Sequence, residues 1–322
     1  MSRDARVVAT WPLTELARTR LQDVAAHVDD VSASRPDRAE LAALLREADA
    51  LITFPLTARL DSEMLRDAKR LKVVATVAVG YDNIDLLVCG ERGIKVGNTP
   101  GVIADATADI GFALLLATMR RIVSGVDFIR AGRWERGEMH PYGNDLARKT
   151  LGIFGMGTIG FALAQRARAA KMEIVYHNRH PRTEIPDSFA RYVSFEELLA
   201  SADAVAVTAP LTPQTRGIFD ERAFAAMKPD AYFVNVARGG LVKTDALYAA
   251  LRDGKLAYAG LDVTDPEPLP LSHPLWSLPN LVVTPHMGTS TPETRDEMLQ
   301  LAVSNVIAGL RGEPLPAEVR LG

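Results

Sequence analysis

The segment TLGIFGMGTIG, residues 150–160, constrains the fold more than any other part of this 322-residue chain. An apolar run leads into Gly155, Gly157 and Gly160, and a helical pattern, FALAQRARAA, follows at once. In a dinucleotide site the first glycine makes a tight turn, the second lets the backbone approach a pyrophosphate, and the third lets the helix pack on the sheet. A second apolar strand, MEIVYHNRH, follows where such folds place their ribose-binding residue. The sequence therefore predicts a dinucleotide-binding fold; the alternative is a glycine-rich turn without a ligand.

The composition indicates a soluble globular protein whose partner is a small molecule. The formal net charge is -3, so we expect neither a nucleic acid nor a membrane surface as the partner. No window offers the roughly eighteen uncharged apolar residues of a membrane helix. Cys89 is the single cysteine, which excludes an intramolecular disulfide, and MSRDARVVATWPL lacks the apolar core of a signal peptide, so a cytoplasmic location is expected. Scattered histidines and one thiol predict no metal site.

Apolar strands alternate with helical patterns along the chain, which predicts an α/β fold with parallel sheets. We expect two doubly wound domains, with a Rossmann-type dinucleotide-binding domain inserted into a smaller, flavodoxin-like substrate domain. The expected parts are residues 1–98, residues 99–288 with six strands, and a C-terminal helix, 289–322, that returns to the substrate domain. A buried helix is predicted over 105–118, and 133–149 is irregular enough to form an exposed arm.

Three polar residues follow apolar strands at the edge where a doubly wound sheet binds its ligand. Arg238 comes after YFVNVA, Glu267 lies between two prolines, and His286 follows LVVTP. Together they suit a carbonyl reductase, because a cation can hold the substrate, an imidazole can move a proton and a carboxylate can orient the imidazole. The alternatives are a surface ion pair, a solvated turn residue and a structural histidine, respectively.

The chain resembles the D-isomer-specific 2-hydroxyacid dehydrogenases over nearly its whole length, and most closely their glyoxylate/hydroxypyruvate reductase branch. The catalytic arginine, glutamate and histidine of that family fall on Arg238, Glu267 and His286. Thr264, Met287 and Ala78 depart from the usual family residues. The motifs that carry the resemblance, in chain order, are VGYDNIDL, NTPGVIADATAD, GIFGMGTIG, PLTPQTRGIF, NVARGGLV, GLDVTDPEP and TPHMGTSTPETR.

The resemblance also implies which residues bind the ligands. The backbone amides of Val79 and Gly80 would receive the substrate carboxylate, together with Arg238 and His286. Asp262 would bind the nicotinamide carboxamide. Asp105 and Thr107 are further candidates for ligand binding, and the alternative is that they only cap a helix. The remaining implied cofactor contacts are Gly155, Met156, Gly157, Thr158, Ile159, Gly160, Asn178, Arg179, Ala209, Pro210, Thr215, Val236, Ala237, His286, Gly288 and Thr107.

The residues after the second strand bear on the choice of cofactor. A site selective for NAD presents a carboxylate to the ribose hydroxyls, and here Asn178 takes that place. A neutral Asn178 followed by Arg179 favours a 2′-phosphate, and His180 or Arg182 can add charge. We therefore expect NADP(H) to be preferred; the alternative is that Arg179 points to solvent and NAD(H) also serves.

By this resemblance the protein is expected to be an NADPH-preferring reductase of small 2-oxo acids, with His286 as the proton donor. The alternatives are a hydroxyphenylpyruvate or phosphoglycerate dehydrogenase and, outside the enzymes, a nucleotide-sensing binding module. The loop Phe54–Thr57 would decide the size of the substrate pocket. Family precedent implies a homodimer in which Trp134 reaches the partner's active site, and the alternative is a Trp134 buried in its own chain.

Overall fold

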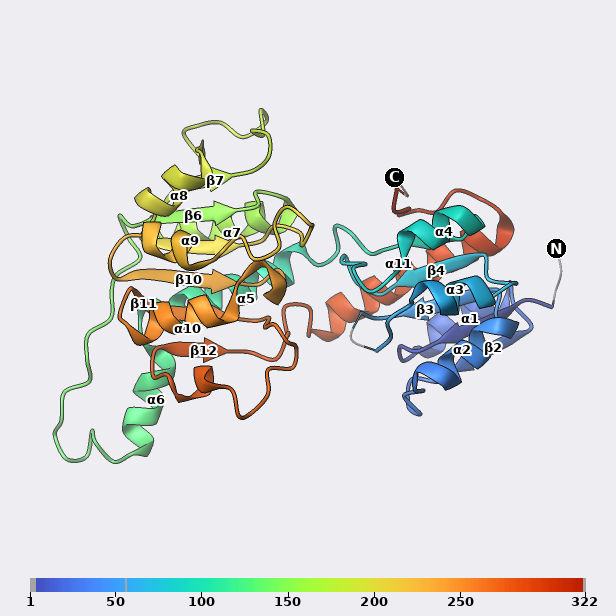
Figure 1. Cartoon of the computed structure of the whole chain (residues 1–322), viewed down its shortest axis with the longest axis horizontal. Helices are drawn as coiled ribbons and strands as arrows, with labels where there is room; N and C mark the ends of the chain where they lie inside the picture. The colour runs from blue at the N-terminus through green and yellow to red at the C-terminus, as the bar shows by residue number, and fades with distance from the viewer. Residues whose placement is uncertain (1–3, 56, 321–322) are drawn as a thin grey trace. The chain divides into compact units, whose positions relative to one another are not determined.

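The computed structural model describes residues 4–55 and 57–320, and the chain divides into two compact units (Figure 1). One unit comprises the chain up to residue 103 together with the segment from residue 290, and the other comprises residues 104–289. The boundaries expected from the sequence were 98/99 and 288/289. Leu56, in the loop expected to size the substrate pocket, lies outside the described residues.

The first unit is a parallel sheet in the order β2-β1-β3-β4-β5, the flavodoxin-like order. Helices α1 and α11 pack together on one face, and α2, α3 and α4 form the layer on the other. Its elements are β1 (Arg6–Ala9), α1 (Glu15–Gln22), β2 (His27–Asp30), α2 (Arg38–Glu47), β3 (Ala50–Thr53), α3 (Ser62–Asp67), β4 (Val73–Thr76), α4 (Leu86–Arg92), β5 (Lys95–Gly97) and α11 (Pro292–Arg311).

The second unit is a parallel sheet in the order β12-β11-β10-β9-β6-β7-β8, which contains the dinucleotide-binding order of strands. Helices α5 and α7 cover one face, and α8, α9 and α10 cover the other, each layer with its own apolar core. Its elements are α5 (Ala104–Met119), α6 (Ile122–Arg130), β6 (Thr150–Phe154), α7 (Thr158–Ala169), β7 (Glu173–His177), β8 (Arg191–Tyr192), α8 (Phe195–Ser201), β9 (Ala204–Val207), α9 (Glu221–Ala226), β10 (Ala231–Asn235), η1 (Gly239–Leu241), α10 (Thr244–Arg252), β11 (Leu256–Leu261), η2 (Pro274–Ser277) and β12 (Leu281–Val283).

These two sheets confirm the predicted fold class, since every strand pair among the described residues is parallel. The predicted buried helix is confirmed as α5. The prediction of six strands in the dinucleotide-binding unit was one short, because β8 adds a two-residue strand at the sheet edge. Such a short edge strand carries no apolar run, so the sequence pattern did not reveal it.

The ends of the helices follow local capping chemistry. Asp37 and Glu40 form a capping box at the start of α2, so two free backbone amides gain partners. Helix α11 begins with Thr291 as the cap and Pro292 in the first turn, and it ends at Gly312 in the left-handed region. These signals set the bounds of α11, which contacts β3, β4 and β5 of its own unit.

The segment from α6 to β6 is an arm that carries many exposed apolar side chains. No helix or strand is formed over residues 131–149, as the irregular sequence there predicted. Figure 1 shows α6 and the chain after it extending away from the sheet of their own unit. Trp134 is 69% exposed, so the alternative that it is buried within its own chain is wrong.

No helix in the described part of the chain combines the length and the apolar character needed to cross a membrane.

Asn305 ties α11 to the end of β5. Its side-chain amide donates to the Asn98 carbonyl at 3.0 Å, and its side-chain oxygen accepts from the Ala317 amide at 3.0 Å. A Cβ atom on Gly97 would lie 2.7 Å from the Asn305 amide group, so glycine is required where the two elements meet. Asn305 is fully buried, and its loss leaves two buried backbone groups without partners.

Replacing Asn305 with alanine should therefore lower the free energy of unfolding by about 2 kcal/mol, because each unpartnered buried group costs free energy. Urea denaturation followed by circular dichroism measures this. Glu297→Ala, on the exposed side of the same helix, is the matched control and should leave stability almost unchanged. Equal stability of the two variants would contradict this account of Asn305.

Candidate active site

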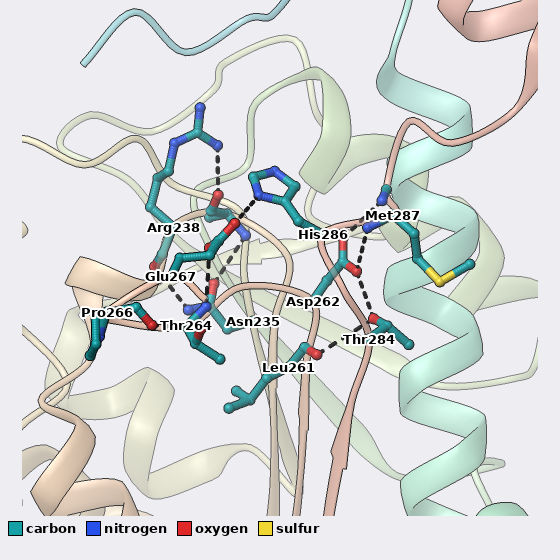
Figure 2. A network of polar contacts seen from close by, with 12 residues as sticks. Asn235, Arg238, Leu261, Asp262, Thr264, Pro266, Glu267, Thr284, His286 and Met287 are labelled. Atoms are coloured by element: carbon teal, nitrogen blue, oxygen red, sulfur yellow. Dashed lines mark hydrogen bonds and ion pairs between the residues drawn. The ribbon is translucent and has the colours of Figure 1, made fainter. Parts of the chain in front are cut away.

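Arg238, Glu267 and His286 gather at one edge of the second unit's sheet. Arg238 follows β10, Glu267 lies in the loop after β11, and His286 follows β12. These strands are neighbours and parallel, so their carboxyl ends meet at the same edge. Figure 2 shows the Glu267 carboxylate directed at the His286 ring, with Arg238 beside the carboxylate. The structure thus brings the three residues singled out in the sequence into one cluster.

The Glu267 carboxylate orients the His286 ring. The His286 Nδ1 and Glu267 Oε1 atoms are 2.5 Å apart, which makes a short, charge-assisted contact when the ring is protonated. The other carboxylate oxygen, Oε2, accepts from the Thr264 amide at 3.2 Å. Both side chains are about a quarter exposed, 25% for the histidine and 23% for the glutamate. With Nδ1 held in this way, Nε2 is left for a ligand.

Asp262 fixes the turn that carries His286. This buried carboxylate accepts from the Thr284 hydroxyl at 2.6 Å, the Met287 amide at 2.8 Å and the Gly288 amide at 2.8 Å. His286 itself has a φ of 52°, a left-handed conformation that costs a non-glycine residue on the order of 1–3 kcal/mol. Its amide donates to the Asp262 carbonyl at 2.9 Å. The hydrogen bonds to Asp262 therefore offset the strain in the turn.

Asn235 performs a similar task for Arg238. The fully buried Asn235 side chain donates to the Arg238 carbonyl at 2.9 Å and accepts from the Ala237 amide at 3.0 Å, which holds the turn after β10. The Arg238 guanidinium donates to the Ala237 carbonyl at 2.8 Å. A Cβ on Gly239 would overlap the Thr264 carbonyl, so glycine allows the loops after β10 and β11 to approach closely.

The glycine loop between β6 and α7 has the geometry that an anionic dinucleotide needs. Gly155 has a φ of 104°, and a Cβ on it would overlap the backbone of Ala209. A Cβ on Gly160 would lie 2.5 Å from the Gly155 carbonyl, whereas beside Gly157 there is open space. No side chain caps α7, so amides in its first turn remain available to a phosphate. The loop thus fits the cofactor that its sequence predicts.

Asn178 braces this loop from the end of β7. Its side-chain oxygen accepts from the Met156 amide at 2.7 Å. Arg182 donates to the Met156 carbonyl at 3.1 Å and pairs with Glu184 at 2.6 Å, so its charge is already engaged. Arg179 and His180 are exposed. Arg179 is therefore freer than Arg182 to bind a 2′-phosphate.

The other residues that the resemblance implies for the cofactor or for helix capping lie on α5 and in the loops after the strands. Thr107 on α5 is buried, its hydroxyl has no partner within the described chain, and a Cβ on Gly288 would lie 3.5 Å from it. Asp105, in contrast, is exposed and pairs with Arg166 at 3.1 Å. The Thr215 hydroxyl donates to the Pro210 carbonyl at 2.8 Å and so braces the loop after β9. Four further implied cofactor contacts lie in the loops after β9, β10 and β12: Ala209, Val236, Ala237 and Gly288.

Val79 and Gly80 belong to the first unit, where they follow β4. Neither backbone amide has a hydrogen-bond partner among the described residues, and both residues are half-buried. Because the amides point to no protein acceptor, they can serve an anionic ligand.

The sequence reasoning missed Asn235 and Thr284 as residues that position the cluster. Each is a polar residue at the end of an apolar strand, and the pattern alone does not separate such a residue from a surface one. The signal available for Asn235 was its place in the apolar run AYFVN, where a buried amide must find partners.

A comparison with known protein families shows to which family the chain belongs. Residues 112–288 match the family described as D-isomer specific 2-hydroxyacid dehydrogenase, NAD binding domain. The chain belongs to this family. It is thus an oxidoreductase that uses a nicotinamide dinucleotide, and the clustered arginine, glutamate and histidine lie in its dinucleotide-binding unit.

Individual relatives agree with this assignment. The dehydrogenase is 45% identical over 287 residues to a glyoxylate reductase of Thermococcus litoralis, covering 87% of this chain and 86% of the relative. It is 44% identical to the human glyoxylate reductase/hydroxypyruvate reductase, covering 78% and 77% of the two chains. An NADPH-dependent glyoxylate/hydroxypyruvate reductase of Sinorhizobium meliloti, solved with NADP and malonate, has a TM-score of 0.86 at 30% identity, covering 98% and 97%.

Proposed function

We propose that the protein reduces small 2-oxo acids, glyoxylate and hydroxypyruvate, to 2-hydroxy acids, in the D form where C2 becomes a stereocentre, with NADPH preferred. The contact between Glu267 and His286 carries the chemical part of this proposal, since it leaves Nε2 of the ring as a proton donor. The names of the relatives support the choice of glyoxylate and hydroxypyruvate.

In this proposal the bound dinucleotide supplies the hydride, and the residues of the chain bind the acid and deliver the proton. The amides of Val79 and Gly80 receive the carboxylate, and the Arg238 guanidinium binds the acid and polarises its carbonyl. Protonated His286 donates from Nε2 to the developing alkoxide, while Glu267 stabilises the imidazolium and fixes its direction. Thr107 and the first turn of α7 hold the dinucleotide, and Asp262 contributes to the binding of its carboxamide.

Initial rates with purified protein test the substrate assignment. Glyoxylate and hydroxypyruvate should oxidise NADPH rapidly, and phenylpyruvate and 3-phosphohydroxypyruvate should react slowly. His286→Gln should lower turnover by about 10²- to 10⁴-fold, the usual contribution of a general acid, while dinucleotide binding measured by calorimetry persists. His27→Gln, at an exposed histidine of the other unit, is the control.

Unchanged turnover of His286→Gln would refute the role of the histidine. Faster reaction of a bulky or phosphorylated acid would reassign the enzyme to the hydroxyphenylpyruvate or phosphoglycerate type. Absence of turnover with all four acids would favour a nucleotide-sensing module.

The preference for NADPH rests on the charges beside the glycine loop. Asn178 is neutral and its side-chain oxygen is occupied by the Met156 amide, so no carboxylate from this position repels a 2′-phosphate. Arg179 follows on the surface, and no contact of its guanidinium with another described residue is found. A cation in that place can pair with a phosphate.

Arg179→Asp should raise the KM for NADPH by about 10- to 100-fold, because a charge-assisted hydrogen bond worth roughly 1.5–3 kcal/mol is lost. The KM for NADH should change much less, since NADH carries no 2′-phosphate. Arg222→Asp, on the exposed start of α9, makes the same charge change elsewhere and serves as the control. If Arg179→Asp affects both cofactors equally, the specificity argument is wrong.

A homodimer joined through the dinucleotide-binding units is the assembly that we propose. The support is the concentration of exposed apolar side chains on α6 and the arm after it, since large exposed apolar patches mark interaction surfaces. Trp134 lies on this arm and can reach a second copy. The exposed residues are Ile122 (52%), Val123 (42%), Val126 (42%), Ile129 (57%), Trp134 (69%), Met139 (76%) and Tyr142 (83%).

Sedimentation equilibrium should give twice the chain mass of 34.9 kDa. Ile129→Asp should shift the mass toward the monomer, because it places a charge within an apolar contact. Leu271→Asp, at a 92% exposed leucine outside this segment, should leave the dimer intact. A monomeric wild-type protein would refute the proposed assembly.

A further inference from the structure

Arg182 connects two loops at the carboxyl edge of the second unit's sheet. It lies in the loop between β7 and β8, and its guanidinium reaches the glycine loop between β6 and α7. Nη1 donates to the Met156 carbonyl at 3.1 Å and, more weakly, to the Gly157 carbonyl at 3.5 Å. The guanidinium carbon lies 5.9 Å from the centre of the Phe161 ring on α7. The charge of Arg182 therefore acts on the backbone of the glycine loop.

The backbone and the side chain of Arg182 are both held in place. The Arg182 amide donates to the hydroxyl of Tyr176, a buried residue of β7, at 2.9 Å. The Ile185 amide donates to the Arg182 carbonyl at 3.1 Å, which closes a turn in the loop. Nε donates to the Glu184 carboxylate at 2.6 Å, and the arginine side chain is 31% exposed. The direction of the Nη1 donor is thus fixed from several sides.

Met156 has partners for both of its backbone polar groups. Its amide donates to the Asn178 side-chain oxygen at 2.7 Å, and its carbonyl accepts from Arg182. In a planar trans peptide the carbonyl and the following amide point in opposite directions. The Met156 carbonyl, drawn toward Arg182, therefore turns the Gly157 amide the other way, where it donates to the Gly155 carbonyl at 2.8 Å. These contacts fix the orientation of the peptide group before Gly157.

The next peptide group carries the first amide of α7. The Gly157 carbonyl accepts from the Phe161 amide at 2.9 Å and from Arg182, so the Thr158 amide points away from both. The Thr158 and Ile159 amides have no acceptor among the described residues. Free amides at the start of a helix bind phosphates, whereas a carbonyl turned toward a phosphate would repel it. The orientation that Arg182 imposes is the one that an anion requires.

We propose that Arg182 is a positioning residue that holds the Met156 and Gly157 carbonyls away from the pyrophosphate, so that the amides of Thr158 and Ile159 face it. The pyrophosphate is common to NAD(H) and NADP(H), so this role is independent of the 2′-phosphate. It differs from the added charge for a 2′-phosphate that the sequence suggested for Arg182. The proposal rests on the dinucleotide binding of the family and not on the choice of substrate.

Fluorescence titrations with NADH and NADPH test this role in wild type, Arg182→Met and Arg182→Lys. Arg182→Met keeps an apolar chain beside Phe161 but removes the donor, so the Kd of both dinucleotides should rise by about 10-fold, the loss of one charge-assisted hydrogen bond. The kcat at saturating dinucleotide should change little, because Arg182 acts on the glycine loop and not on the reacting atoms. Arg182→Lys retains a cationic donor for one carbonyl and should recover most of the affinity.

Two control variants separate this contact from the ion pair of Arg182. Arg191→Met removes a guanidinium that pairs with Glu197 at 2.6 Å in the same unit and that contacts no carbonyl of the glycine loop in the described part of the chain. Glu184→Gln removes the carboxylate of the ion pair and leaves the bond from Arg182 to Met156. Both variants should keep the wild-type Kd for NADH and NADPH.

Displacement of bound NADH by ADP and by adenosine locates the effect within the ligand. ADP carries a pyrophosphate and adenosine carries no phosphate. Arg182→Met should therefore weaken ADP by about 10-fold, as it weakens the dinucleotides, and should leave adenosine almost unchanged.

A loss confined to NADPH would overturn the proposal, because it would make Arg182 a ligand of the 2′-phosphate. An equal loss for ADP and adenosine would overturn it as well, since the loop after β7 would then only support the nucleoside. Should Arg182→Met fail to fold, an unchanged Kd for NADH and NADPH in Arg182→Gln would count against the proposal. A wild-type protein that binds both dinucleotides but reduces no 2-oxo acid would refute the proposed function and leave the role of Arg182 standing.

Discussion

The buried carboxylate of Asp262 holds the candidate active site together. Its oxygens accept from Thr284, Met287 and Gly288, which keeps His286 in a left-handed conformation that it would not adopt alone. A carboxylate is tolerated in this buried place because three donors surround it. The same turn directs the His286 ring to Glu267, so the position of one buried side chain determines the geometry of this partly buried pair.

Parallel strands explain why each unit presents its candidate functional groups at one edge. Because the strands of each sheet run in the same direction, their carboxyl ends lie at the same edge, and the loops that follow are free to carry polar residues. In the second unit this edge bears the glycine loop and the cluster of Arg238, Glu267 and His286. In the first unit the same edge bears the backbone amides of Val79 and Gly80, which have no partner among the described residues.

Buried polar side chains that find their partners within one unit organise the backbone of that unit. Asp262, Asn235 and Asn305 are buried, and each has its partners within its own unit, so they organise the backbone. Thr107, in contrast, buries a hydroxyl that has no partner in the described chain. Native proteins seldom leave such an atom alone, and this hydroxyl lies close to Gly288, which follows β12.

The sequence by itself determined the fold class and the identity of the candidate site residues. Glycine spacing and strand alternation carry that information because they reflect local backbone geometry, and the polar residues after apolar runs marked Arg238, Glu267 and His286. The sequence did not reveal β8, because a two-residue strand is too short to form a pattern. It also did not reveal the roles of Asn235 and Thr284, which depend on hydrogen bonds to residues outside their own strands. Only the tertiary structure showed that Arg182 is already engaged, that Trp134 is exposed and that Arg295 stacks on Trp11 and Phe54. Residues 11, 54 and 295 are far apart in the chain, and the burial and pairing of a side chain depend on contacts between such distant segments, which no local pattern encodes.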